Sequence, residues 1–328
     1  MSEGFWRDLP RPIMALAPMA DVTDQAFRRI ILKYGKPDVF WTEFVSADGL
    51  CDPRGREHLI PDLAFVKEEH PIVAQLFTGN PASMESAARF VATCGFDGID
   101  INMGCPDRSV EKQGAGAALM KNYDNAKALI RAAKSGAPHI PVSVKIRVGY
   151  LRNELSEWLP ALLEESPAVV TIHARTRKEM SKVPARWECI REAVAIRDSL
   201  KSTSLIFGNG DVRDIREAYE RVAQTGCDGV MLGRAIFGNP WLFSDRRDPV
   251  TLEERLRVLV EHTELFEKLL GEIKNFSIMK KHYKAYVTGF DGAKELRVKL
   301  METASATEVR LLVEEFLAAG GQDRGMLS

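Results

Sequence analysis

Three residues with reactive side chains lie within or just after short apolar runs of this sequence. Cys105 follows one such run, in the motif Asn-Met-Gly-Cys-Pro at 102–106. Lys145 interrupts the run Val-Ser-Val-Lys-Ile, and His173 ends another. A cysteine in that place can donate a proton or simply fill space in the core. A histidine there can act as an acid or base, contact a cofactor, or be a hydrogen-bonded structural residue.

Lys145 admits three interpretations, because a lysine is seldom buried in an apolar strand without a partner. It can form a Schiff base with a carbonyl substrate, as in barrel aldolases. It can hold positive charge beside a flavin ring and stabilise the anionic reduced form. It can also pair with a carboxylate in a salt bridge. The residue alone leaves these possibilities open.

A second group of residues is suited to binding phosphate. Gly208, Gly210 and Gly233 lie at the ends of two late apolar runs, and Arg234 follows the last of them. Glycines let backbone N–H groups approach an anion, and an arginine adds a charged, bidentate contact. The alternative is an ordinary glycine turn between a strand and a helix. We expect phosphate here, because barrels often bind it after their last two strands.

Eight short apolar runs alternate with amphipathic stretches up to about residue 245. Most runs show no polar–apolar alternation, which is typical of strands buried on both faces. Strand–helix alternation on this scale predicts a TIM (β/α)8 barrel. A doubly wound open sheet is the alternative, and the lack of GxGxxG after the first run weakens it. The expected strands are Ile13–Ala17, Val39–Phe44, Ile72–Phe77, Gly98–Asn102, Val142–Arg147, Val169–His173, Leu205–Gly208 and Gly229–Leu232, with helices such as Met84–Cys94, Asn125–Lys134 and Val212–Ala223.

The pattern becomes purely helical after Pro249, so we expect a catalytic barrel domain at 1–248 and an all-helical domain at 249–328. The expected helices are Leu252–Leu270, Phe276–Val287, Asp291–Met301 and Ala306–Ala319. The segment 274–286 is basic with interleaved aromatic residues, and Lys280 and Lys284 share a helix face. It could contact RNA phosphates, or it could be a solvated helix face with its aromatic residues in the core.

Composition narrows the function classes. A formal net charge of −1 predicts no general attraction to polyanions, although a local patch could still bind one. No apolar run is long enough to span a membrane. The five cysteines are widely spaced and form no zinc-type or disulfide pattern, so we expect no metal and a reducing, cytoplasmic location. No obligatory protein partner is inferred.

The motifs together resemble the tRNA-dihydrouridine synthases. The resemblance covers the whole expected barrel and includes the helical tail. It rests on 102–106 with Gly-Ala-Gly-Ala-Ala-Leu at 114–119, and on His-Ala-Arg-Thr at 173–176. Ala17-Pro18-Met19, Thr42-Glu43-Phe44, Gln75-Leu76, Lys145-Ile146-Arg147-Val148-Gly149, Gly208-Asn209-Gly210-Asp211 and Gly233-Arg234-Ala235 follow in the family's order. Ser109 and Arg186 depart from the pattern, since a basic and an acidic residue are expected there.

The resemblance implies FMN as cofactor, NADPH as reductant and tRNA as substrate. Cys105 would be the catalytic acid. The implied cofactor-binding residues are Pro18, Met19, Ala20, Gln75, Asn102, Lys145, His173, Asn209, Gly210, Asp211, Gly233 and Arg234. The implied tRNA-binding residues are Arg147, Arg175, Lys280, Lys281 and Lys284.

The implied reaction reduces the C5=C6 bond of specific uridines to 5,6-dihydrouridine. Hydride would pass from flavin N5 to C6, and Cys105 would protonate C5 from the opposite face. The target uridine must leave its stack to reach the ring. The main alternative is another FMN-dependent barrel reductase acting on a free pyrimidine or enone. A Schiff-base aldolase using Lys145 and a non-catalytic RNA-binding protein are further alternatives.

Overall fold

The computed structural model describes residues 4–320; the remaining ends of the two predicted domains, 1–3 and 321–328, lie outside the described residues. The chain divides into two compact units. One contains Pro37–Arg234 together with the residues up to Ala20. The other contains Asp21–Lys36 together with the residues from Ala235 onward.

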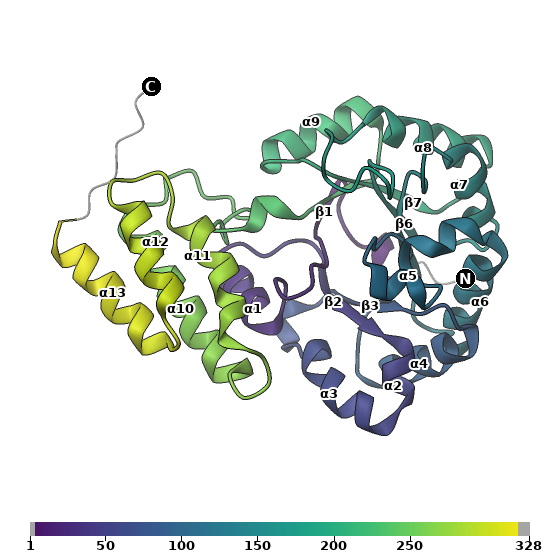
Figure 1. Cartoon of the computed structure of the whole chain (residues 1–328). Helices are drawn as coiled ribbons and strands as arrows, with labels where there is room; N and C mark the ends of the chain where they lie inside the picture. Colours follow the sequence, from purple (N-terminus) through teal and green to yellow (C-terminus); the bar gives the residue numbers. More distant parts are fainter. Residues whose placement is uncertain (1–3, 321–328) are drawn as a thin grey trace. The chain divides into compact units, whose positions relative to one another are not determined.

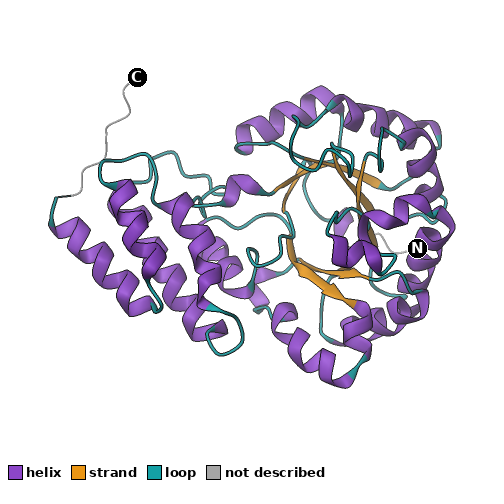
Figure 2. Ribbon diagram, in the orientation of Figure 1, coloured by secondary structure: helices purple, strands orange, loops and turns teal. Residues whose placement is uncertain are grey.

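The first unit is built on an eight-stranded parallel sheet in the order β1-β8-β7-β6-β5-β4-β3-β2. Strands β1 and β2, at the two ends of this order, are joined by a parallel bridge between Ala15 and Val39. A hydrogen bond of 3.2 Å from Leu16 N to Val39 O supports the bridge. The sheet therefore curls round on itself in the manner of a (β/α)8 barrel, inside a ring of helices (Figure 2). The strands are β1 Ile13–Leu16, β2 Phe40–Ser46, β3 Ile72–Phe77, β4 Gly98–Asn102, β5 Val142–Arg147, β6 Val169–His173, β7 Leu205–Asn209 and β8 Gly229–Leu232.

All eight predicted strands are therefore confirmed, five of them with the predicted bounds. Their apolar runs are almost continuously buried, as expected for strands covered on both faces. The prediction for β2 was wrong at its end, because the strand continues two residues past Phe44. Val45 and Ser46 still pair with β3 beyond a register shift between Trp41 and Phe44.

Helices follow most strands of the first unit. They are α2 Ala47–Cys51, α3 Pro53–Leu63, α4 Pro81–Thr93, α5 Arg108–Lys112, α6 Tyr123–Gly136, α7 Leu155–Leu163, α8 Glu188–Ser199 and α9 Ile215–Thr225. Helix α9 begins three residues later than predicted, because the Asp214 side chain caps it by accepting from Glu217 N at 2.8 Å.

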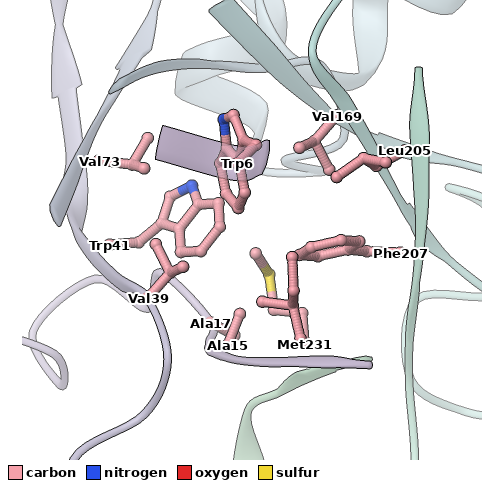
Figure 3. Close-up of a cluster of buried hydrophobic side chains, with 11 residues drawn as sticks. Trp6, Ala15, Ala17, Val39, Trp41, Val73, Val169, Leu205, Phe207 and Met231 are labelled. Atoms are coloured by element: carbon pink, nitrogen blue, oxygen red, sulfur yellow. The ribbon is translucent and has the colours of Figure 1, made fainter. Parts of the chain in front are cut away.

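A short 3-10 helix, η1 (Gly4–Arg7), places Trp6 inside the barrel. Figure 3 shows Trp6 among apolar side chains from several strands. Its ring centroid lies 5.8 Å from those of both Trp41 and Phe207. Ile13, Val73, Val169 and Leu205 in the same cluster stand at or near the first residues of their strands. The cluster therefore fills the amino-terminal end of the barrel and leaves the opposite end for a site.

The regular elements described in the second unit are all helices (Figure 1). It contains α1 Gln25–Tyr34, α10 Leu252–Leu270, η5 Phe276–Met279, α11 Lys280–Tyr286, α12 Ala293–Glu302 and α13 Ala306–Ala318. Helix α1, which follows β1 in the sequence, packs on α10, with the rings of Phe27 and His262 stacked at 4.7 Å. The units thus divide the chain at Arg234 and Ala235 and include Asp21–Lys36 in the second, which differs from the predicted boundary at 248 and 249.

Candidate active site

A cavity of about 280 Å³ opens at the carboxyl-terminal ends of the strands in the first unit. It is the end at which barrel enzymes place their sites. The predicted cofactor residues that line it are Pro18, Met19, Lys145, His173, Asn209, Gly210, Asp211, Gly233 and Arg234. The predicted tRNA residue Arg175 also lines it, with Ser181 and Val212, which the sequence analysis missed.

Lys145 projects from β5 into this cavity. Its Nζ donates to Asn209 Oδ1 at 3.4 Å, and Asn209 Nδ2 donates to Met231 O at 2.7 Å. Burial, with a smaller effect of the Arg147 charge, lowers the pKa of Lys145 to about 8. Among the described residues its hydrogen-bond partner is thus an amide rather than a carboxylate, which does not favour the salt-bridge interpretation.

His173 at the end of β6 is held in its neutral form. Burial lowers its pKa well below the usual value, and the charges of Lys145 and Arg147 act in the same direction. Its Nε2 lies 3.1 Å from Arg175 Nη1. Since a guanidinium only donates, Nε2 accepts and the ring proton belongs on Nδ1. His173 can therefore offer one neutral donor to a bound group.

Asp211 joins two arginines at the edge of the cavity. Its carboxylate accepts from Arg175 and from Arg234, and also from Ala185 N at 2.8 Å. The hydrogen bond from Arg175 holds the pKa of Asp211 below its usual value. Because the Asp211 side chain is used in this way, its contribution to an anion site is to hold the two guanidinium groups there.

Gly210 lets the backbone pass close to these residues. Its φ is +128°, and a Cβ would stand 2.8 Å from that of Ala185 and 3.2 Å from His173 Cδ2. Such a φ strongly favours glycine. Two guanidinium groups, one carboxylate and bare glycine backbone make this part of the cavity suitable for a phosphate.

Cys105 lies in the loop after β4 and outside the residues that line the cavity. The loop is held by Asn102, whose Oδ1 accepts from Gly104 N at 3.1 Å and from Cys105 N at 2.9 Å. Gly116, with φ +58°, passes so close that a Cβ would meet Cys105 O at 2.7 Å. The half-buried thiol has a pKa raised by burial, so it is protonated at neutral pH.

Arg147 ties the loop after β4 to the loop after β6. Its Nε donates to Gly104 O at 2.8 Å, and its Nη1 donates to Thr176 O and Met180 O, each at 3.1 Å. Burial lowers its pKa to about 10. The side chain thus has a clear role in holding the Cys105 loop, and its predicted contact with tRNA stays a prediction.

Three predicted cofactor residues lie apart from the cavity lining. Ala20 is exposed, while Gln75 and Asn102 are buried and hydrogen-bonded to each other at 3.0 Å. Asp100, which was not among the predicted site residues, is completely buried in β4 and accepts from Gln75. An acid inside an apolar strand is the same signal that identified Lys145.

Two arginines in the segment after β6 pair with acidic residues, and one of them is Arg186, which departs from the family pattern. Arg186 pairs with Glu179 at 2.5 Å, and this pairing lowers the pKa of Glu179 to about 2. Arg177 pairs with Glu111, which follows the Cys105 loop. The loop after β6 is therefore fixed by ion pairs both within itself and to α5.

Only some of the lysines predicted to bind tRNA in the basic segment 274–286 are exposed. On α11, Lys281 and Lys284 are exposed and Lys280 is half-buried, and Lys281 pairs with Asp21 at 3.0 Å. Tyr283 and Tyr286 are buried, so these aromatic residues belong to the core of the unit, as the alternative interpretation held.

Two further predictions concern absences. Among residues 4–320, no group of three or more His, Cys, Asp or Glu side chains is arranged to hold a metal ion. None of the helices described has the length and apolar character needed to cross a membrane.

Comparison with known proteins identifies the family to which this chain is similar. The family model described as dihydrouridine synthase matches residues 15–319. The chain is 42% identical over 325 residues to a probable tRNA-dihydrouridine synthase of Staphylococcus aureus strain Mu50, covering 98% of each chain. It is 41% identical over 318 residues to probable tRNA-dihydrouridine synthase 2 of Bacillus subtilis strain 168, covering 96% of this chain and 97% of that one.

Solved structures share the fold at low identity. A 6-hydroxypseudooxynicotine amine oxidase from Pseudomonas geniculata N1 has a TM-score of 0.56 and 12% identity, over 83% of this chain and 54% of that one. A histamine dehydrogenase from Rhizobium sp. 4-9 has a TM-score of 0.52 and 12% identity, over 77% of this chain and 48% of that one. The family match over most of the chain is the decisive finding: the chain belongs to the dihydrouridine synthase family.

Proposed function

We propose that this protein is a tRNA-dihydrouridine synthase that reduces the C5=C6 bond of specific tRNA uridines, using bound FMN and NADPH as reductant. The observation that carries the proposal is the pairing of a phosphate-suited cavity with a protonated thiol on the adjoining loop. Membership in the family supports the same activity. We expect it to act in the cytoplasm, without an obligatory protein partner.

The cavity residues fit FMN by their chemistry. Arg175 and Arg234, held together by Asp211, would receive the phosphate beside Gly210 and Gly233. Lys145 and neutral His173 would offer donors to the polar edge of the ring. When bound, FMN supplies the hydride for C6 of the uracil.

The protein's own contribution to the reaction is the proton. Cys105 carries it on Sγ, and burial keeps the thiol protonated until it is needed at C5. Asn102 and Arg147 fix the backbone on either side of this thiol. After donating, the thiolate would be stabilised by the nearby charges of Arg147 and Lys145, which lower the pKa of Cys105 in opposition to burial.

The proposal assigns tRNA binding partly to the second unit. Lys281 and Lys284 on α11 are exposed and can reach phosphates, with Lys280 one turn before Lys284. Arg147 and Arg175 would act at the barrel. Because such contacts release counterions, affinity for tRNA should fall steeply with salt concentration.

The test compares Cys105→Ala with Cys94→Ala, whose cysteine is exposed on the outside of the barrel unit. The purified protein should be yellow, and both variants should keep FMN. Cys105→Ala should lose dihydrouridine formation by about a hundredfold or more, the usual contribution of a general acid, while Cys94→Ala stays active. Unchanged turnover in Cys105→Ala would refute the mechanism.

A gel shift with tRNA distinguishes the proposed function from the main alternative. A reductase that acts on a free pyrimidine or enone would be yellow and would reduce the small molecule without binding tRNA. A colourless protein that borohydride traps with a carbonyl substrate would instead indicate Schiff-base chemistry at Lys145.

A further inference from the structure

We propose that Asp100 is a positioning residue: it fixes the direction of a chain of two amides that in turn holds the backbone of Cys105. The inference rests on the proposed function for the role of Cys105, and it adds a residue that touches neither the cavity nor the thiol.

The chain of hydrogen bonds starts at Asp100, which is fully buried in β4. Gln75 Nε2, from the neighbouring strand position on β3, donates to Asp100 Oδ2 at 2.6 Å. Gln75 Oε1 accepts from Asn102 Nδ2 at 3.0 Å. Asn102 Oδ1 then accepts from the backbone N–H groups of Gly104 and Cys105.

The direction of this chain follows from hydrogen-bond chemistry. The two backbone N–H groups of the loop can only donate, so Asn102 must present its oxygen to them. Its amide nitrogen then needs an acceptor, which is the oxygen of Gln75. The Gln75 nitrogen in turn needs an acceptor, and an ionised carboxylate offers nothing else. Asp100 therefore prevents either amide from turning over.

The other carboxylate oxygen of Asp100 faces β5. Oδ1 accepts from Ser143 Oγ at 2.6 Å, and Ser143 stands opposite Asp100 in the strand register. The negative charge of Asp100 also favours the protonated form of Lys145, two residues further along β5. Burial raises the pKa of Asp100 to about 6, so the carboxylate form predominates at neutral pH.

Two substitutions of Asp100 separate the effect of hydrogen-bond direction from the effect of the carboxylate charge. Asp100→Asn keeps an oxygen for Gln75, because the new amide nitrogen can donate to Ser143 Oγ, whose own proton can turn to Ile99 O, now 3.3 Å away. Asp100→Leu has the same number and branching of side-chain heavy atoms, with methyl groups larger than the oxygens they replace, and no acceptor. Asp38→Leu is the matched control, since Asp38 accepts from Met14 N at the opposite end of the barrel.

The experiment measures kcat and KM for tRNA, FMN content, and the rate at which iodoacetamide alkylates Cys105 without tRNA. We expect Asp100→Leu to lower kcat about tenfold to a hundredfold, as for a misplaced reacting group, with KM changed less than about twofold. Its alkylation rate should change by a similar factor. Asp100→Asn should stay within about threefold of the parent at pH 7 in both readouts, and Asp38→Leu should leave the alkylation rate unchanged.

A charge-swapped pair covers the case in which Asp100→Leu does not fold. Gln75→Glu places two carboxyl groups together. Adding Asp100→Asn restores a complete chain, in which the new carboxylate at position 75 accepts from the new amide at position 100 and from Asn102, so Asn102 keeps its orientation although the bond between positions 75 and 100 is reversed. The double variant should recover the parent's alkylation rate at pH 8, while Gln75→Glu alone should not.

Asp100→Leu with unchanged kcat and alkylation would overturn the role of Asp100 while leaving that of Cys105 intact. Equal losses in Asp100→Asn and Asp100→Leu would also overturn it, because direction would then not matter. Full activity of Cys105→Ala would instead remove the proposed function itself.

Discussion

Gly208 in β7 leaves space that the indole of Trp187 fills. A Cβ at position 208 would stand 2.2 Å from Trp187 Cζ3 and 2.6 Å from Cη2, well inside van der Waals contact. Trp187 is buried and its Nε1 donates to Gly210 O at 2.9 Å. Gly208→Ala must therefore move the indole and break or stretch this hydrogen bond.

Two energetic costs determine how far Gly208→Ala lowers the free energy of unfolding. Overpacking a filled core costs roughly 1–3 kcal/mol. Leaving the buried indole N–H and the Gly210 carbonyl without their bond costs about 1–3 kcal/mol more. We therefore expect Gly208→Ala to lower the free energy of unfolding of the barrel unit by about 2–6 kcal/mol. Because Gly210 lines the cavity, FMN content should also fall.

A double-mutant cycle tests the reasoning. Trp187→Leu removes the ring that an alanine would strike, so adding Gly208→Ala to it should cost less than about 1 kcal/mol. Urea unfolding followed by circular dichroism gives the free energies, and amide exchange of the β7 backbone assigns the transition to the barrel. If the two substitutions proved additive, the clash with Trp187 would not be the reason for glycine at 208.

Two further predictions concern buried basic groups. Because the folded pKa of Lys145 lies near 8 and not at its usual 10.5, the unfolded chain binds more protons between these values, and stability rises with pH across that interval. In FMN-free protein, Lys145→Met should therefore add about 1–3 kcal/mol of stability at pH 7 in urea unfolding, a gain that shrinks above pH 10; an equal gain at both pH values would contradict this. In the second unit, burial lowers the pKa of His282 to about 3 from 6.5, so the unfolded chain takes up the proton first and stability falls as pH drops through this window. Between pH 7.5 and 4.5, His282→Phe should remove about 2–3 kcal/mol of this loss, measured by urea unfolding against Lys284→Ala as control.

The strands could be predicted because a local run of apolar residues marks each buried strand. Runs such as Ile72–Phe77 are apolar at every position but one, and a parallel strand covered on both faces needs only that. The end of β2 was missed, since its extension depends on pairing with β3 past an irregular register. The packing of Trp6 in the barrel end was also missed, because a four-residue helix has no periodicity from which its burial could be inferred.

The site residues could likewise be predicted only in part. Lys145, His173 and the glycines stand next to strand ends, so their position alone indicated a site. The partners that fix them are distant in sequence: Arg177 meets Glu111 from 66 positions away, and Arg175 meets Asp211 from 36. Charge patterns along the chain carry no information on such pairs until the barrel brings the loops together.

Helix α1 makes the second unit discontinuous in sequence, and this limits how the two units can be expressed separately. The polypeptide leaves the barrel unit after Ala20, returns at Pro37 and leaves again after Arg234. During synthesis, the apolar face of α1 with Phe27, Ile30 and Ile31 emerges long before the helix α10 that covers it. A gene fragment ending at Arg234 would therefore encode the barrel together with an orphan amphipathic helix, and no single cut in the gene separates the two units.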